Sequence, residues 1–306
     1  MWTEQVQNTL KEQGFTETLN YSFVGKKDIA TLGYTESDHT QLVELENPIS
    51  EDFAYLRVNL VDRLLKSLIS NEKILQGENI KLFEIGKVFK KTARGVEEHL
   101  FLGALLALPT KGTYEHFYFL KGVVDVVCSN LGIAGVWYDD FLARPDQGRQ
   151  SIWHPKISAE IKIGNRELGF IGEISPSVIS NLKLERRVGA FEIDLDALIS
   201  LAIEEREHRP PSKFTAVLRD IALLVPLETK VEEVLNVMES TGGALVADID
   251  LFDMYEGEEI PEGKKNLAFH LLYQAEDRTL TNKEVDELQN KIISALEENE
   301  SWQARQ

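Results

Sequence analysis

Cysteine and histidine, two residue types that often carry catalysis or hold metals, are sparse in this chain. The only cysteine, Cys128, lies in an apolar segment with helical spacing, where we expect a buried thiol rather than a nucleophile. The six histidines form neither H-x-x-x-H nor H-E-x-x-H pairs, so we expect no metal site. His154, which precedes a proline, is interpreted as structural. The chain also lacks the phosphate-binding pattern G-x-x-x-x-G-K-[ST] and the nucleophile pattern G-x-S-x-G.

Net charge limits the kinds of partner that the chain attracts. Its 306 residues include 33 lysines and arginines against 51 aspartates and glutamates, a formal charge of −18. Two thirds of that excess falls in residues 201–306, which carry 11 basic and 23 acidic side chains. A negative protein repels phosphate at long range, so any nucleic-acid contact needs a local cluster of cations. No apolar run is long enough for a membrane span, and the lone cysteine fits the cytoplasm.

A charged run closed by two prolines divides the chain. The segment Glu204–Pro211 loses two backbone donors at its end and favours extended geometry, which is typical of a linker. We therefore expect two domains, at 1–205 and 211–306. The alternative is a polar helix end followed by a loop inside one domain.

Hydrophobic periodicity predicts a mixed, mainly antiparallel α+β first domain with helices on one side of its sheet. Helices are expected at 2–13, 59–74 and 114–131, with a short one from Pro176. Strands are expected at 15–23, 80–90, 100–108, 157–163, 168–174 and 189–195, with a hairpin turn at Gly164-Asn165.

The second domain is expected to have the order β-α-β-β-α-β, the ferredoxin-like arrangement. Its strands are predicted at 216–225, 245–255, 265–273 and 301–305, and its helices at 231–239 and after Thr281. Thr281 and Glu284 have the spacing of a capping box. Many unrelated functions use this topology, so the residues alone leave the function open.

Several strings, in order and at matching spacing, resemble the C-terminal part of the bacterial phenylalanine–tRNA ligase β subunit family. In the first domain they are Gly14-Phe15-Thr16-Glu17, Tyr21-Ser22-Phe23, Asn47-Pro48-Ile49-Ser50, Leu56-Arg57-Val58-Asn59-Leu60, the segment 83–89 (FEIGKVF), His154-Pro155, the segment 169–176 (GFIGEISP) and Phe191-Glu192-Ile193-Asp194-Leu195. In the second they are Lys213-Phe214, Arg219-Asp220-Ile221-Ala222, the segment 251–257 (LFDMYEG), the segment 263–268 (GKKNLA) and Asp277-Arg278-Thr279-Leu280-Thr281.

The resemblance implies a class II aminoacyl-tRNA synthetase-like core without activity, followed by a ferredoxin-fold anticodon-binding domain. It implies a catalytic α subunit as partner in an α2β2 heterotetramer, with ATP and Mg on that partner and no cofactor in this chain. It also implies binding of tRNA(Phe) and no membrane. Longer family members carry upstream modules, so the chain is expected to be an excised part or a reduced subunit.

Two departures from the catalytic pattern of that class support an inactive core. Arg57 is followed by Val58-Asn59, with no glutamate two positions on to complete Arg-x-Glu. The segment Gly189–Asp196 offers carboxylates where a cation would face a triphosphate, and like charges are unfavourable there.

Contacts with partners are predicted for two groups of side chains. For the α subunit the candidates are an apolar helix face formed by Trp2, Val6 and Leu10. The alternative is that these three pack within their own domain. For tRNA the candidates are cations and stacking aromatics, namely Lys213, Phe214, Arg219, Tyr255, Lys264, Lys265, Arg278 and Arg305. The alternative is that Arg219-Asp220 and Asp253 form internal pairs and that Phe214 and Phe252 belong to the core.

Two other functions are considered. The first is an interaction or regulatory module that kept the fold and lost tRNA binding, marked by an acidic sheet face without convergent lysines or arginines. The second is an active class II ligase, which the departures around Arg57 and Gly189–Asp196 disfavour.

Overall fold

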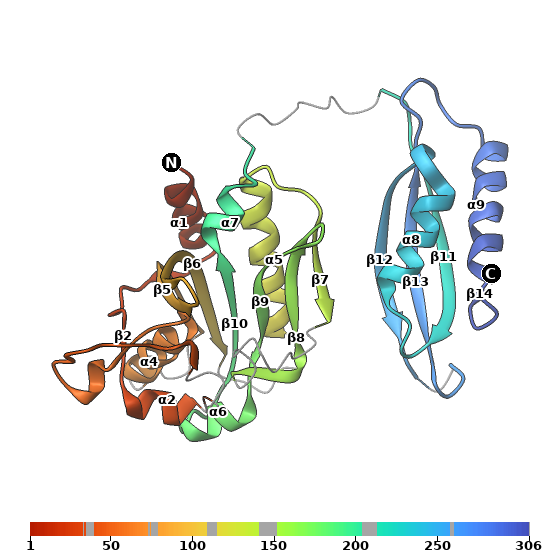
Figure 1. Ribbon diagram of the computed structural model, residues 1–306. Helices are drawn as coiled ribbons and strands as arrows, with labels where there is room; N and C mark the ends of the chain where they lie inside the picture. The colour runs from red at the N-terminus through yellow and green to blue at the C-terminus, as the bar shows by residue number, and fades with distance from the viewer. Residues whose placement is uncertain are drawn as a thin grey trace. The chain divides into compact units, whose positions relative to one another are not determined.

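A computed structural model describes residues 1–32, 34, 40–72, 74, 79–108, 115–140, 152–203, 213–257 and 260–305. The chain forms two compact units, Met1–Arg206 and Glu207–Gln306, and each is described by itself. The predicted linker at 204–211 lies outside the described residues. Figure 1 shows the elements of both units.

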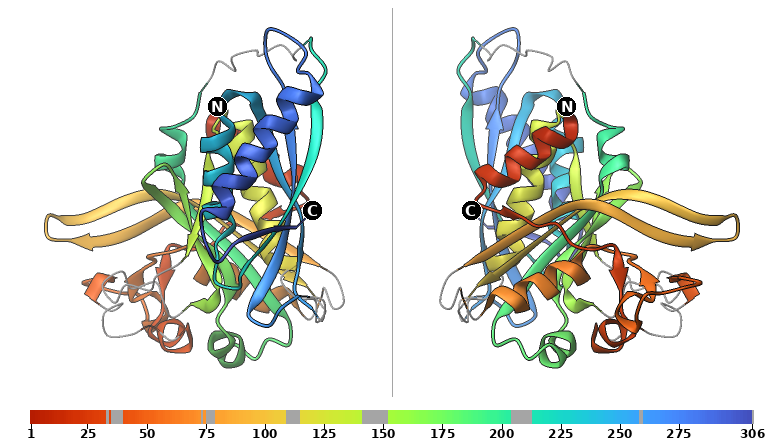
Figure 2. Two further views of the ribbon diagram at one scale, coloured as in Figure 1. Left: turned by 90° about the vertical axis from the view of Figure 1, so that its right-hand side faces the viewer. Right: turned by 90° about the vertical axis from the view of Figure 1, so that its left-hand side faces the viewer.

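The first unit is built on a seven-stranded sheet of order β1-β5-β6-β10-β9-β8-β7, in which β1 pairs parallel to β5 and the other pairs are antiparallel. Its strands are β1 (Thr16–Glu17), β5 (Ile80–Thr92), β6 (Gly95–Leu108), β7 (Val136–Asp140), β8 (Trp153–Ile163), β9 (Arg166–Ile174) and β10 (Arg187–Asp194). The hairpin predicted at Gly164-Asn165 is confirmed between β8 and β9. The β5–β6 hairpin, gold in Figure 2, projects well beyond the sheet.

Helices cover both faces of this sheet, so the prediction of helices on one side is wrong. The helices are α1 (Trp2–Glu12), α2 (Lys26–Leu32), α4 (Val61–Glu72), α5 (Glu115–Asn130), α6 (Pro176–Asn181) and α7 (Leu195–Ile199). One apolar cluster joins α1, α5 and α7 to one face, and another joins α4 and α6 to the other face. The reason is visible in β6, where the run from Phe101 to Ala107 is buried on consecutive residues and therefore on both faces.

The helix α1 is packed against its own domain. Val6 and Leu10 are buried in the first apolar cluster, and Trp2 is partly buried against it. The expectation of an exposed apolar face at these residues is therefore wrong, and the alternative of packing within the domain holds. The helix ends before Gly14, whose backbone has φ +81°, a conformation that glycine adopts at little cost.

The single strand predicted at 15–23 is also wrong, because the chain leaves the sheet after Thr18. The backbone N–H of Thr18 still donates to Phe83, but the side-chain amide of Asn20 then donates to the Glu84 carboxylate at 2.8 Å. The chain continues into a separate three-stranded sheet of order β2-β4-β3. Its strands are β2 (Phe23–Val24), β3 (Val43–Glu44) and β4 (Tyr55–Leu56), with a 3₁₀ turn η1 (Glu51–Phe53) before the last.

The second unit has the predicted β-α-β-β-α-β order and a four-stranded antiparallel sheet of order β12-β13-β11-β14. Its elements are β11 (Val217–Pro226), α8 (Val231–Gly242), η2 (Gly243–Leu245), β12 (Val246–Tyr255), β13 (Lys264–Tyr273), α9 (Asn282–Glu297) and β14 (Gln303–Arg305). Both helices pack on one face through a single apolar cluster. The predicted fold class, mixed α+β with a ferredoxin-like second domain, is confirmed. In the described part of the chain, each helix is too short or too polar to span a membrane.

Candidate nucleic-acid interface

The sheet of the second unit has one face covered by helices and one open face. Along β11, Ile221, Leu223 and Val225 point toward α8 and α9 and are buried, as strand alternation requires. The intervening side chains point the other way, and strand register adds their neighbours on β12, β13 and β14. This open face is the only face of the sheet not occupied by the unit's two helices.

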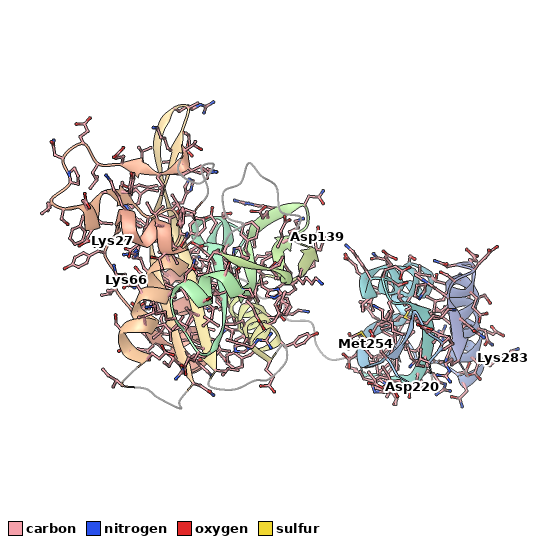
Figure 3. All side chains as sticks on the ribbon, turned by 90° about the horizontal axis from the view of Figure 1, so that it is seen from below. Lys27, Lys66, Asp139, Asp220, Met254 and Lys283 are labelled. Atoms are coloured by element: carbon pink, nitrogen blue, oxygen red, sulfur yellow. The ribbon has the colours of Figure 1, made fainter. Side chains whose placement is uncertain are left out.

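An aromatic stack lies on the open face. The rings of Phe252 and His270 are nearly parallel, at 12°, with centroids 3.8 Å apart. Nδ1 of His270 lies 2.7 Å from Oδ1 of Asp220, which Figure 3 labels. Phe252 is 47% exposed, so the alternative that placed it in the core is wrong. Tyr255, a predicted contact, is 44% exposed on the same face.

The predicted cations do not converge. Strand register places Lys264 and Arg305 on the open face, whereas Arg219 points to the helix side and pairs with Asp286 at 3.5 Å. Arg278 pairs with Glu284 at 2.8 Å beyond the end of β13. The remaining predicted residues are the exposed Lys213 and the half-buried Phe214, both just before β11, and the half-buried Lys265, which register places on the helix side.

Carboxylates dominate the open face. Asp220 on β11 and three aspartates of β12 are exposed there, namely Asp248, Asp250 and Asp253. Exposed carboxylates repel phosphate but accept hydrogen bonds from base amino groups, while aromatic rings stack on bases of any sequence. The face is therefore better suited to unpaired bases than to a duplex backbone. Sequence reasoning missed Phe252 and His270, although both occupy outward positions beside buried strand residues.

The first unit carries a buried polar network on the sheet face that α4 covers. Nη1 of Arg57 lies 2.6 Å from Oε1 of Glu84, and both side chains are buried. Nε of the same arginine donates to the Lys87 carbonyl at 2.8 Å. Leu60 approaches the sheet so closely that a Cβ on Gly103 would lie 2.8 Å from the leucine Cβ. The chain's own segment thus fills this part of the face.

The carboxylates of β10 are also used internally, and this bears on whether the face fits ATP. Glu192 is buried and accepts the backbone N–H of Leu60 at 2.9 Å. Asp194 accepts the N–H of Ala197 at 2.8 Å and caps α7. A triphosphate requires cations, but Arg57 is already neutralised by Glu84. Arg57 and the β10 carboxylates therefore do not supply the positive charge that ATP would need at this face.

Other reactive side chains have structural surroundings. Burial raises the pKa of the Cys128 thiol to about 12, which leaves it protonated and unreactive. His116 is buried beside Arg187, and burial lowers the pKa of its imidazole. Among the residues that the structure describes, no three His, Cys, Asp or Glu side chains gather as metal ligands.

Comparison with known proteins assigns the family. Residues 2–195 match the family model described as the phenylalanyl tRNA synthetase beta chain CLM domain. The chain belongs to the phenylalanyl-tRNA synthetase beta chain family. Residues 212–305 match the ferredoxin-fold anticodon binding domain, which agrees with the topology of the second unit.

Relatives from several bacteria extend over both units of this family member. It is 36% identical to the phenylalanine–tRNA ligase beta subunit of Clostridium acetobutylicum over 295 residues, which are 95% of this chain and 36% of the relative. The corresponding subunit of Moorella thermoacetica is 35% identical over 97% of this chain and 37% of its own length. The chain therefore spans little more than a third of the curated relatives that it matches.

Solved structures support the fold of the synthetase-like part. A crystal structure of pyrrolysyl-tRNA synthetase from Desulfitobacterium hafniense superposes with a TM-score of 0.52 at 18% identity, covering 65% of this chain and 67% of that chain. A second structure of that enzyme gives a TM-score of 0.53 at 17% identity. At this identity the likeness concerns the fold alone.

Proposed function

We propose that this chain is the non-catalytic C-terminal portion of a phenylalanine–tRNA ligase β subunit, which supports a catalytic α subunit in the cytoplasm and binds tRNA(Phe) near its anticodon. The observation that carries the RNA-binding part is the open sheet face, with exposed Phe252 and Tyr255, in a unit that matches an anticodon-binding family. Unpaired anticodon bases offer the ring faces that such side chains stack on.

The aminoacylation chemistry is assigned to the partner. Arg57, Glu84 and Glu192 are committed to the internal network of the first unit, so Arg57 is not available to neutralise phosphate charge there. ATP and Mg²⁺ are therefore expected on the α subunit, in an α2β2 assembly. This chain contributes position and contact area.

An exposed apolar surface replaces α1 as the candidate contact with the α subunit. Leu19 is 89%, Tyr21 75% and Ile49 95% exposed, near the small β2-β4-β3 sheet. Phe53 packs edge-on against Tyr21 at 6.0 Å, which joins the two segments that carry these residues. Exposed apolar side chains that form a contiguous patch mark sites of protein contact.

Co-purification with the α subunit tests the assembly. We expect the two chains to elute together, and Tyr21→Asp combined with Ile49→Asp to separate them. The matched control is Val96→Asp, which alters a residue that is also exposed but lies at the tip of the β5–β6 hairpin. Elution of the double variant with the α subunit would refute the proposed surface.

Aminoacylation tests the division of labour. The α subunit with this chain should charge tRNA(Phe), and the chain alone should not exchange pyrophosphate into ATP when phenylalanine is added. Exchange by the chain alone would refute the non-catalytic assignment.

The structure shows the mark expected of the interaction-module alternative, since the open face is acidic and the predicted cations do not converge on it. The exposed aromatics of that face and the anticodon-binding match favour RNA binding instead. Binding of a tRNA(Phe) anticodon stem-loop by the full chain separates the two functions, because the module would not bind it.

A further inference from the structure

We propose that His270 is a proton-dependent RNA contact, in which the protonated imidazole, stacked on Phe252 and held by Asp220, supplies a cation to single-stranded RNA on the open face. The inference rests on the proposed function. It names one residue of the proposed RNA site and the protonation state in which that residue binds RNA. It follows from the geometry of three strands.

Strand register holds the imidazole in place. Asp220 of β11 and Asp250 of β12 are the cross-strand partners of His270 on either side. A register shift lies between Leu251 and Asp253, and the extra residue there is Phe252. A β-bulge re-aims the side chain that it inserts, and here the inserted ring stacks on the imidazole at 3.8 Å.

The bonding of the ring leaves one edge for a ligand. Nδ1 faces Asp220 at 2.7 Å, and within the described residues Nε2 has no hydrogen-bond partner. The side chain of His270 is 36% exposed. When this imidazole is protonated, Nε2 also carries a hydrogen and can donate it to a ligand, whereas in the neutral ring bonded through Nδ1–H to Asp220 the Nε2 atom only accepts. A base that stacks on the aromatic pair would bring its phosphate or its acceptor atoms to that edge.

The charged side chains around His270 determine how much its protonation changes the charge of the open face. The groups that face it are Asp220 from β11, and Asp250 with Asp248 and Asp253 from β12, while its neighbours along β13 are the uncharged Ala268 and Leu272. Of the cations on the face, Lys264 lies six residues from His270 along β13, and Arg305 on β14 is the cross-strand partner of Ala222, two residues along β11 from Asp220. A neutral His270 therefore leaves its two direct cross-strand partners, Asp220 and Asp250, without a positive charge between them.

Proton linkage gives the direction of the effect. Histidine is the side chain whose charge changes between about pH 5 and 8. A ligand that binds the cation more tightly than the neutral ring must lose affinity as the pH rises through that range. A charge-assisted hydrogen bond contributes about 1.5 kcal/mol or more, which corresponds to about tenfold in affinity.

The test measures binding of a fluorescent single-stranded RNA oligonucleotide to the full chain by anisotropy, at pH 5.5 and pH 8.0 and constant ionic strength. The wild type is expected to bind about tenfold more weakly at pH 8.0. His270→Gln should bind weakly at both values, and His270→Arg tightly at both. Circular dichroism at each pH verifies that the variants are folded.

A matched control separates this residue from the general change in protein charge. His99→Gln also removes a histidine of 37% side-chain exposure that lies near a carboxylate, at 3.6 Å from Glu97 on β6. It removes the same number of titrating groups and should keep the wild-type pH dependence.

The outcomes separate this inference from the proposed function. Equal wild-type affinity at both pH values, or an unchanged pH dependence in His270→Gln, would overturn the role of His270 while leaving RNA binding intact. Failure of every variant, including His270→Arg, to bind RNA at pH 5.5 would overturn both.

Discussion

At the scale of single residues, a buried ion pair joins the segment before α4 to the central sheet of the first unit. The side-chain amide of Asn20 also donates to Glu84 of this pair. The three side chains therefore connect the segment after β1, strand β5 and the segment before α4. Removing one partner of a buried pair leaves an uncompensated charge, whereas replacing both by apolar groups is far less costly.

Arg57→Met is therefore expected to lower the free energy of unfolding of the first unit by about 3–5 kcal/mol. The double variant Arg57→Met with Glu84→Met should recover most of that loss. Differential scanning calorimetry of the full chain measures both. Lys87→Met breaks the exposed Lys87–Glu98 pair and serves as the control, because an exposed ion pair contributes little to stability. Equal losses in the single and double variants would contradict the argument.

A second buried carboxyl makes stability depend on pH. Burial raises the pKa of Asp62 to about 6, although the hydroxyl of Tyr34 donates to it. A raised carboxyl pKa means that the folded state binds the proton more tightly than the unfolded chain, so this contribution to stability is lost as pH rises from about 4 through 6.

Between pH 5 and pH 7.5 the wild type should lose about 1–2 kcal/mol more of its unfolding free energy than Asp62→Asn does. Denaturant titrations of the full chain at the two pH values measure the difference. Asp52→Asn, at an exposed position in η1, should keep the wild-type dependence. A parallel pH profile for wild type and Asp62→Asn would disprove the assignment.

At the scale of elements, the start of α9 is fixed by local side chains. Thr281 Oγ1 accepts the N–H of Glu284 at 3.3 Å, and the Glu284 carboxylate accepts the N–H of Thr281 at 2.9 Å. Each of these bonds satisfies a backbone donor that the helix itself leaves unpaired. The same carboxylate receives Arg278, which ties the preceding loop to the helix.

Thr281→Ala should cost about 1 kcal/mol and speed hydrogen exchange at the first turn of α9, measured by mass spectrometry on the full chain. Ser294→Ala is the control, because Ser294 lies within the helix and only donates back to the Asn290 carbonyl. Unchanged exchange in Thr281→Ala would show that packing alone determines where α9 begins.

Helices and strands whose apolar residues repeat with a single spacing could be predicted from the sequence. Elements whose ends or direction depend on contacts with distant residues could not. The alternation in β11 and β13 and the stripe of α9 gave the second unit its correct order. The chain at Asn20 leaves the sheet because of a side-chain bond to Glu84, a residue 64 positions away. Likewise, periodicity identified the apolar stripe of α1 but not what covers it.

The sequence was enough to predict that the second unit has a candidate RNA-binding face, but not which side chains lie on that face. Residue type selected Tyr255, Lys264 and Arg305, which strand register places on the open face. It also selected Arg219, whose position in β11 points it to the helices and to Asp286. Phe252 was missed as a contact because its apolar ring favoured a place in the core, although its position after the inward Leu251 is an outward one.

At the scale of the whole molecule, the charge of −18 limits how RNA is attracted. With few cations on the open face, few counterions are released on binding, and stacking supplies most of the affinity. The slope of log K against log salt should therefore be shallow, equivalent to about one or two phosphate contacts. Anisotropy titrations of the full chain from 50 to 300 mM salt test it, and a slope near that of about six contacts would refute it.

The order β12-β13-β11-β14 leaves β12 with one side unpaired by any described strand. Such a strand is a template on which another unfolded or partly folded chain can pair and begin to aggregate. β12 has two register shifts, which twist its free edge, and it carries Asp248, Asp250 and Asp253, which place negative charge along that edge. Replacement of these aspartates by threonine would then shorten the lifetime of concentrated solutions, even where the folded unit loses no stability.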